Sequence, residues 1–163
     1  MTPSFVAGRC RLYADEGGAA ASYNVAMANE RIRVFILERH PAIRAGLRAL
    51  LESSPEIVVV GEAGDSAGIL AHIMATQPDI VLLDPDLPDD GGLPLLRELS
   101  AALPAASLLV HTDDGASAKM QAAFAAGVQG YLLKGQSSQK LVQTIRLLYA
   151  SRVDLTANRD LPD

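Results

Sequence analysis

From Arg31 onward, short apolar runs alternate with segments whose apolar residues recur at helical spacing, and this alternation constrains the fold more than any other feature. The runs have the length of strands and are rich in valine, isoleucine and leucine, which is typical of strands buried on both faces. Strands are predicted at 32–37, 57–60, 80–83, 107–111 and 128–133. Because parallel strands need a crossover connection, usually a helix, the alternation predicts an α/β fold.

The segments between the runs carry helix signals at their ends. Pro41 suits the first position of a helix, where its missing N–H costs nothing, and Gly127 suits the residue after a helix end. Helices are predicted after Pro41, after the cap Asp65-Ser66, over 93–102, over 116–126 and after the cap Ser137-Ser138. Alternation of this kind predicts a doubly wound, five-stranded parallel sheet of the flavodoxin-like order 2-1-3-4-5.

The chain of 163 residues is one domain with some excess at its ends. Residues 1–29 are rich in alanine, glycine and serine and bury too little apolar surface to order themselves. We therefore expect a flexible N-terminal extension at 1–29, the domain at 30–150, and a tail or the start of a linker at 151–163. Residues 1–26 are expected to be dispensable for stability.

Composition and missing motifs exclude several classes of protein. The net charge of −5 does not indicate a basic surface that would bind nucleic acid. No apolar run is long enough to span a membrane. The single cysteine, Cys10, and the lack of a signal peptide suit the cytoplasm. Glycine-rich dinucleotide and P-loop motifs are absent. The histidines, His40, His72 and His111, lack metal-ligand spacing and are interpreted as structural or solvated.

Side chains with charged or reactive groups lie at the ends of three of the predicted strands. Asp84 closes a buried apolar run and precedes a turn rich in Pro, Asp and Gly. Thr112 and Lys134 close the next two runs. Because ligands of open α/β sheets bind at the carboxyl ends of the strands, these side chains are expected to share one site. A carboxylate nucleophile, a hydroxyl donor and a cation form a set that can accept a phosphoryl group.

The segment from Arg31 to about Leu155 resembles the receiver domains of bacterial response regulators, and among these the NarL/FixJ group. Three stretches carry the resemblance together with the strand-end residues: Arg44-Ala45-Gly46-Leu47-Arg48-Ala49-Leu50-Leu51 after His40-Pro41, Val60-Gly61-Glu62-Ala63, and Gly130-Tyr131-Leu132-Leu133-Lys134. The similarity covers about three quarters of the chain and implies a signalling module of a two-component system that is not an enzyme.

The resemblance also implies residue roles. Asp84 matches the acceptor of a phosphoryl group from a histidine kinase, and Thr112 and Lys134 match the hydroxyl and the ammonium that contact that group. Tyr131 matches the aromatic residue that swings inward when the hydroxyl moves. The carbonyl of Asp86 matches the one that faces a metal ion.

The first strand departs from the family at its end. The family places two acids where this chain has Glu38 and Arg39. An arginine cannot ligate Mg²⁺, and a guanidinium beside Asp84 disfavours the ion electrostatically. We therefore expect no metal or other cofactor. If Mg²⁺ does bind, we expect its ligands to be Glu38, Asp84 and Asp86. Arg39 is expected to stand in for the ion by pairing with Asp84 or with Glu38.

Three functional hypotheses follow. The chain is an atypical receiver that regulates through protein contacts, or a working receiver phosphorylated on Asp84, or a pseudo-receiver that senses a small molecule. A homodimer is expected from the family and from apolar side chains of the first and last predicted helices, namely Ile43, Leu47, Leu148 and Tyr149. DNA contact is expected only through a further C-terminal domain, and no contact with a membrane is expected.

Overall fold

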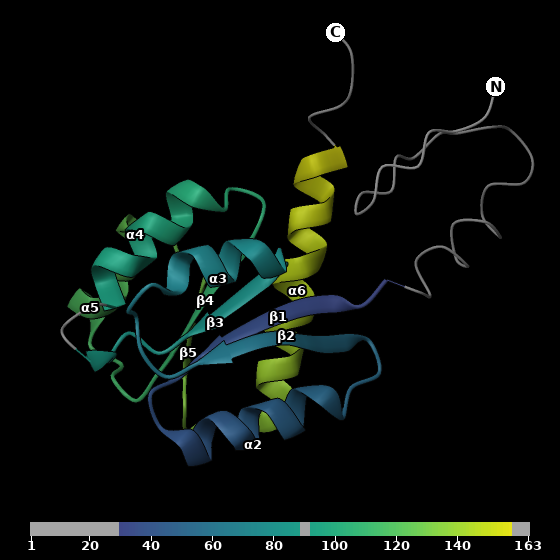
Figure 1. Ribbon diagram of the computed structural model, residues 1–163, viewed down its shortest axis with the longest axis horizontal. Coiled ribbons are helices and arrows are strands. Elements are labelled where there is room, and N and C mark those ends of the chain that lie inside the picture. The colour runs from purple at the N-terminus through teal and green to yellow at the C-terminus, as the bar shows by residue number, and fades with distance from the viewer. Residues whose placement is uncertain (1–29, 89–91, 158–163) are drawn as a thin grey trace, which may run out of the picture.

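The computed structural model describes residues 30–88 and 92–157, with the backbone alone for 153–157 (Figure 1). Five parallel strands form one sheet in the order β2-β1-β3-β4-β5. The strands are β1 Ile32–Leu37, β2 Ile57–Ala63, β3 Ile80–Leu83, β4 Ser107–Thr112 and β5 Gly130–Leu133. The helices are α2 Pro41–Glu52, α3 Ile69–Thr76, α4 Gly92–Ala102, α5 Ser117–Ala125 and α6 Ser138–Ala157. The predicted fold class and strand order are confirmed.

Two apolar cores lie on opposite faces of the sheet because side chains alternate along each strand. Helices α3, α4 and α5 cover one face, where Phe35 and Leu83 are buried. Helices α2 and α6 cover the other face, where Ile36 and Leu82 are buried. In Figure 1, α2 lies below the strands and α3 and α4 lie above them. Both faces are closed, which accounts for the nearly continuous apolar runs of the sequence.

Several element boundaries differ from the predicted ones: β5 begins at Gly130 instead of at 128, and two other differences have a structural cause. β2 continues to Ala63, because its pairing with β1 resumes beyond a register shift opposite Val34 and Phe35. α3 begins at Ile69, because the Asp65 carboxylate accepts a hydrogen bond from the Ala67 N–H and so closes a turn instead of capping the helix. The residue before α3 is Gly68, whose φ of 64° is left-handed and favours glycine.

α6 continues through 151–157, into the segment predicted to be a tail or a linker. Arg152 anchors this part of the helix, since its guanidinium contacts Asp79 Oδ1 at 2.6 Å and lies over the ring of Tyr149. Asp79 directly precedes β3, so the contact ties the helix to the amino edge of the sheet. The extension expected at 1–29 lies outside the described residues.

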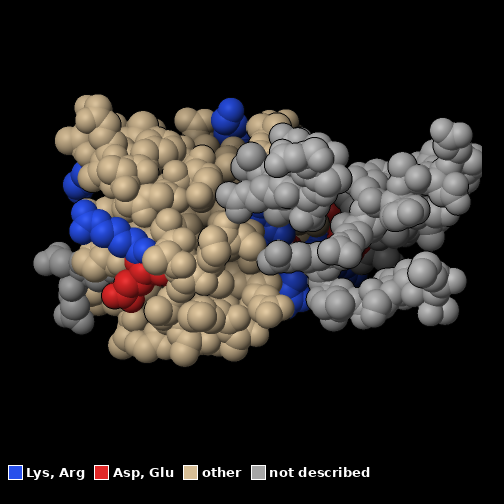
Figure 2. Space-filling model, turned by 90° about the horizontal axis from the view of Figure 1, so that it is seen from above, with Lys and Arg blue, Asp and Glu red and all other residues tan. Residues whose placement is uncertain are grey.

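The face formed by α3 and α4 carries few charged side chains (Figure 2). α3 has no charged residue at all, and its Met74 is 43% exposed. The described part of this face therefore offers no cluster of basic side chains to a nucleic acid. Among the described residues, no helix combines the length and apolar character needed to cross a membrane.

Candidate functional site

Four residues lie at the carboxyl edge of the sheet. Glu38 follows β1, and Asp84 follows β3, with the Asp84 N–H bonded to the carbonyl of Leu37 at 2.8 Å. Thr112 ends β4, and the Lys134 N–H beyond β5 bonds to the Thr112 carbonyl at 2.8 Å. Because β1, β3, β4 and β5 are neighbours and parallel, their ends meet at one place. The structure thus places the strand-end residues that the sequence indicated at one edge. Asp84 and Lys134 are in contact there, while the Thr112 side chain faces the other side of the sheet.

The Lys134 ammonium lies between two buried carboxylates. Its Nζ is 2.7 Å from Asp84 Oδ2 and 2.8 Å from Glu38 Oε2. The side chains of Lys134, Asp84 and Glu38 are only 8%, 3% and 2% exposed. The contact at Glu38 Oε2 is an ion pair without the geometry of a well-formed hydrogen bond. One internal cation therefore neutralises one of the two carboxylate charges of this site.

The pKa values of the pair reflect this arrangement. Burial alone would raise the pKa of Glu38, but the Lys134 ammonium and the hydrogen bonds from His40 outweigh it and lower that pKa. Burial alone would lower the pKa of Lys134, but Asp84 and Glu38 raise it. Glu38 and Lys134 are therefore both charged at neutral pH, and the ion pair is intact.

His40 is a site residue that sequence reasoning missed. Its backbone N–H and its ring Nδ1 both contact Glu38 Oε1, at 2.9 and 2.8 Å. One donor atom each of Glu38, His40 and Asp84 lie within 4.8 Å of one another. The signal was local: a residue two positions after a strand-end acid, directly before a helix-opening proline, can turn back onto that acid.

Arg39 does not pair with Asp84 or with Glu38, and that prediction was wrong. Its Nε donates to His40 Nε2 at 3.2 Å, and its Nη1 donates to the carbonyl of Asp86 at 3.4 Å. Arg39 is exposed while Glu38 is buried, because successive side chains at a strand end point in opposite directions. Lys134 therefore forms the ion pair that was expected of Arg39. Arg39 instead donates a hydrogen bond to the backbone carbonyl that was expected to face a metal ion.

The loop after β3 holds Asp84 firmly. The Asp86 N–H donates to Asp84 Oδ1 at 2.9 Å, which orients the carboxylate. Gly92 opens α4 against the same loop, and a Cβ there would overlap the backbone of Pro85. Glycine is thus required at position 92 by the close approach of two backbones.

Thr112 and Tyr131 lie on the opposite side of the sheet from the ion pair, with Asp114 between them. Thr112 is fully buried, and its Oγ1 accepts from the Asp114 N–H at 3.1 Å. The Tyr131 hydroxyl donates to the Asp114 carbonyl at 2.6 Å. Burial raises the pKa of Tyr131, and the charge of Asp114 adds to this effect. In this structure Tyr131 is therefore fixed to the β4–α5 loop, directly beyond the threonine that ends β4.

Comparison with known proteins agrees with this geometry. Residues 34–146 match the model of the response regulator receiver domain. The chain is 36% identical over 121 residues to the DNA-binding transcriptional activator DevR/DosR of Mycobacterium tuberculosis, covering 74% of this chain and 56% of that protein. It is 36% identical over 124 residues to the response regulator UvrY of Escherichia coli, again covering 74% and 56%. The chain thus spans just over half the length of these relatives.

Solved structures give the same result. A LuxR-family two-component response regulator from an Aurantimonas species superposes with a TM-score of 0.71 at 36% identity, covering 76% of this chain and 88% of that one. The signal receiver domain of the putative response regulator NarL from Mycobacterium tuberculosis gives 0.69 at 31% identity, covering 74% and 98%. The chain belongs to the response regulator receiver domain family.

Proposed function

We propose that this chain is an atypical receiver, a non-enzymatic module that regulates through protein contacts and does so without Mg²⁺-dependent phosphorylation. One observation carries the proposal: the Lys134 ammonium bridges Glu38 and Asp84, while Arg39 stands where the family has its second acid. A DNA-binding partner domain and a cytoplasmic location belong to the same proposal and rest on the relatives.

The residues present do not fit Mg²⁺. This ion demands octahedral oxygen ligands and is held in proteins by carboxylates and waters. Here the two carboxylates share an ammonium, and the Asp86 carbonyl accepts from Arg39. Two cationic groups thus surround the place where a divalent ion would have to enter, and both repel it.

A second candidate is a working phosphoacceptor that receives its phosphoryl group from a histidine kinase. The observation in its favour is the retained set of Asp84, Thr112 and Lys134 at one sheet edge. A small-molecule ligand at the same edge is the third candidate, and it would be detected as a ligand-dependent rise in the melting temperature.

Incubation with Mg²⁺ and a small-molecule phosphodonor separates the first two candidates. We expect the intact mass of the protein to stay unchanged, because no metal is expected to neutralise the incoming phosphoryl oxygens and Lys134 is already paired with two carboxylates. A phosphoryl adduct that is lost in the variant Asp84→Asn would instead establish the working phosphoacceptor.

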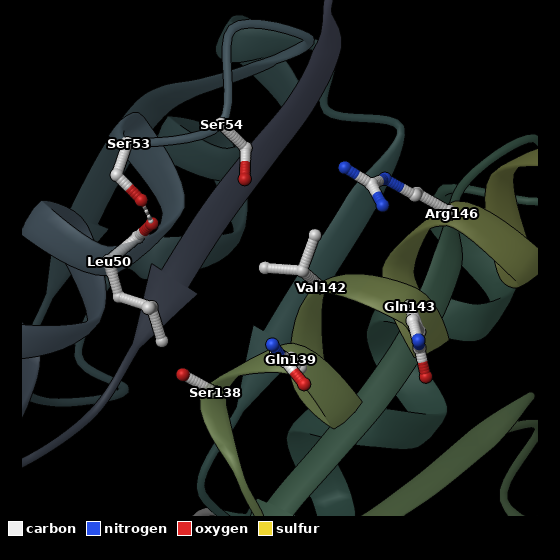
Figure 3. Close-up of a pocket in the computed structure, with 8 residues that line it drawn as sticks. All are labelled: Leu50, Ser53, Ser54, Ser138, Gln139, Val142, Gln143 and Arg146. Carbon is white, nitrogen blue, oxygen red and sulfur yellow. Dashed lines mark hydrogen bonds between the residues drawn. The ribbon is translucent and has the colours of Figure 1, made fainter.

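A homodimer through α2 and α6 is part of the proposal. Leu47 was expected to be partly exposed there but is buried, whereas Ile43 and Leu147 are 37% and 68% exposed. A groove runs between the two helices, lined by Leu50, Ser53, Val142 and other residues (Figure 3). These features support a contact surface in which Leu147 of α6 is the most exposed of the large apolar side chains described.

Leu147→Glu is expected to raise the dissociation constant of the dimer at least about tenfold, because it would bury a charge in the contact. The matched control is Met74→Glu, which changes an exposed apolar residue of α3 on the opposite face. Sedimentation velocity at high micromolar concentration measures both. An unmodified protein that sediments only as a monomer would refute this part of the proposal.

A further inference from the structure

We propose that residues 150–157, the last part of α6, form a conformational switch that is held in the helical state by a latch between Arg152 and Asp79. With the latch closed, the chain leaves the domain as a continuous helix. With the latch open, the helix ends near Tyr149 and the residues that follow become a flexible linker. The inference concerns the amino edge of the sheet, so it is independent of metal binding or phosphorylation at the opposite edge.

The sequence of 150–157 favours a helix only weakly. Half of its residues are serine, valine, aspartate or threonine, which have lower helix propensity than alanine or leucine. The sequence places Asp154 in the final turn, where a negative charge is unfavourable near the negative end of the helix dipole. A helical stretch this short gains most of its stability from tertiary packing. The helical state of this segment therefore depends on its contacts with the rest of the domain.

Apolar packing of α6 against the sheet ends before this segment begins. The apolar residues that pack there lie between Leu141 and Tyr149. The next two side chains are exposed, and the hydroxyl of Ser151 donates within the helix, to the Leu147 carbonyl at 2.9 Å. Side chains of α6 are described as far as Arg152, and of those beyond Tyr149 this one makes a polar contact with another element.

The Arg152 guanidinium holds Asp79 at two points. Its Nη2 is 2.6 Å from Asp79 Oδ1, and its Nη1 donates to the Asp79 carbonyl at 3.2 Å. The same guanidinium lies 5.5 Å from the centre of the Tyr149 ring, which is a favourable cation–π distance. The side chains of Arg152 and Asp79 are 24% and 16% exposed, so solvent screens their attraction only in part. The latch is therefore stronger than an ion pair on an open surface.

Asp79 is a fixed anchor, because two neighbouring strands hold it. Its N–H donates to the Arg33 carbonyl of β1 at 2.8 Å, and its Oδ2 accepts from the Arg33 N–H at 2.9 Å. Its carbonyl accepts from the N–H of Ser107, where β4 begins, at 2.8 Å. Burial raises the pKa of Tyr149, and the charge of Asp79 raises it further. Opening of the latch would therefore release the end of the helix and leave the sheet in place.

A second arginine of α6 provides an internal comparison. Arg146 contacts Glu56 directly before β2, as Arg152 contacts Asp79 directly before β3. The Arg146 side chain is 54% exposed, and its neighbour Ile145 is completely buried in the core. The helix around Arg146 is therefore held by apolar packing, and its ion pair contributes little.

The first test is hydrogen–deuterium exchange of the whole chain, measured by NMR at the backbone amides of α6. Arg152→Gln removes the latch and hardly changes helix propensity. We expect the amides of 152–156 to lose protection at least about tenfold, the loss expected for a hydrogen bond between charged groups. The amides of 141–148 and of the strands should keep their protection. Arg146→Gln is the matched control and is expected to leave 152–156 as protected as in the unmodified protein.

Trypsin provides a second test, because it cleaves after Arg152 only when the chain around that bond leaves the helix. Asp79→Asn keeps this cleavage site and removes the charge of its partner. We expect cleavage after Arg152 to become at least about tenfold faster than in the unmodified protein, since the rate follows the population of the open state. Glu56→Gln removes the partner of Arg146 and is expected to leave this rate unchanged.

Several outcomes would overturn the inference. One is unchanged protection of 152–156 in Arg152→Gln, or an equal loss in Arg146→Gln. Another is a lack of protection at 152–156 in the unmodified protein, since the segment would then be open whatever Arg152 contacts. Loss of protection throughout α6 and the strands in Arg152→Gln would show that the pair supports the whole domain and not a separate switch. Equal rates of cleavage after Arg152 in Asp79→Asn and Glu56→Gln would also contradict it.

Discussion

Lys134→Met is expected to lower the free energy of unfolding by about 3–5 kcal/mol, the usual cost of removing one partner from a buried ion pair. The variant keeps the length of the aliphatic side chain but leaves the carboxylates of Glu38 and Asp84 facing each other without a cation. Both acids are almost completely buried, so water cannot replace the ammonium. Urea denaturation at neutral pH measures the loss.

Two further variants isolate the cause. Lys119→Met removes the partner of Asp114 from an exposed ion pair, and we expect no measurable change in stability. The double variant Lys134→Met with Glu38→Gln is expected to recover part of the loss, since it leaves one carboxylate in place of two. Equal stability of Lys134→Met and Lys119→Met would show that the buried pair has no structural importance.

Arg39→Asp is expected to create Mg²⁺ affinity where the unmodified protein has none, with a dissociation constant of millimolar or below, which corresponds to about 4 kcal/mol or more of binding free energy. The variant restores a second acid next to Glu38 and frees the Asp86 carbonyl from the Arg39 guanidinium. Without metal, the added negative charge near Asp84 should destabilise the fold through like-charge repulsion. Added Mg²⁺ should then raise the melting temperature.

Arg39→Gln is the matched control, because it removes the guanidinium and adds no acid. We expect no Mg²⁺ binding by this variant. If Arg39→Gln bound Mg²⁺ as well as Arg39→Asp did, the guanidinium alone would be the obstacle and the number of acids would be irrelevant. If neither variant bound Mg²⁺, Lys134 would be sufficient to exclude the ion.

Most of the fold could be predicted from the sequence, because hydrophobic periodicity is a property of individual segments. Alternating strand and helix patterns predicted the sheet order and the edge where Asp84 and Lys134 meet. The end of β2 was missed because its last residues are held by pairing with β1 across a register shift, which is a tertiary effect. The start of α3 was missed because Asp65 closes a turn with the same type of side-chain bond that would cap a helix.

The partners within the site were harder to predict than its location. Charge alone could not decide whether Arg39 or Lys134 reaches Asp84, since both are cations near the same sheet edge. The direction of the side chains decided it: Arg39 follows an inward-facing Glu38 and so points outward. His40 was interpreted as structural or solvated because its contact with Glu38 depends on the turn before α2, which carries no periodic signal.

Calorimetric titration of the unmodified protein with Mg²⁺, in the absence and presence of beryllofluoride, tests the central claim most directly. Beryllofluoride imitates a phosphoryl group on an aspartate and needs the metal to bind, so it reports on both requirements at once. If Lys134 keeps both carboxylates paired as the structure shows, neither titration should give saturable heat at millimolar Mg²⁺. Saturable Mg²⁺ binding, followed by a beryllofluoride complex that Asp84→Asn abolishes, would contradict the account and establish a working phosphoacceptor.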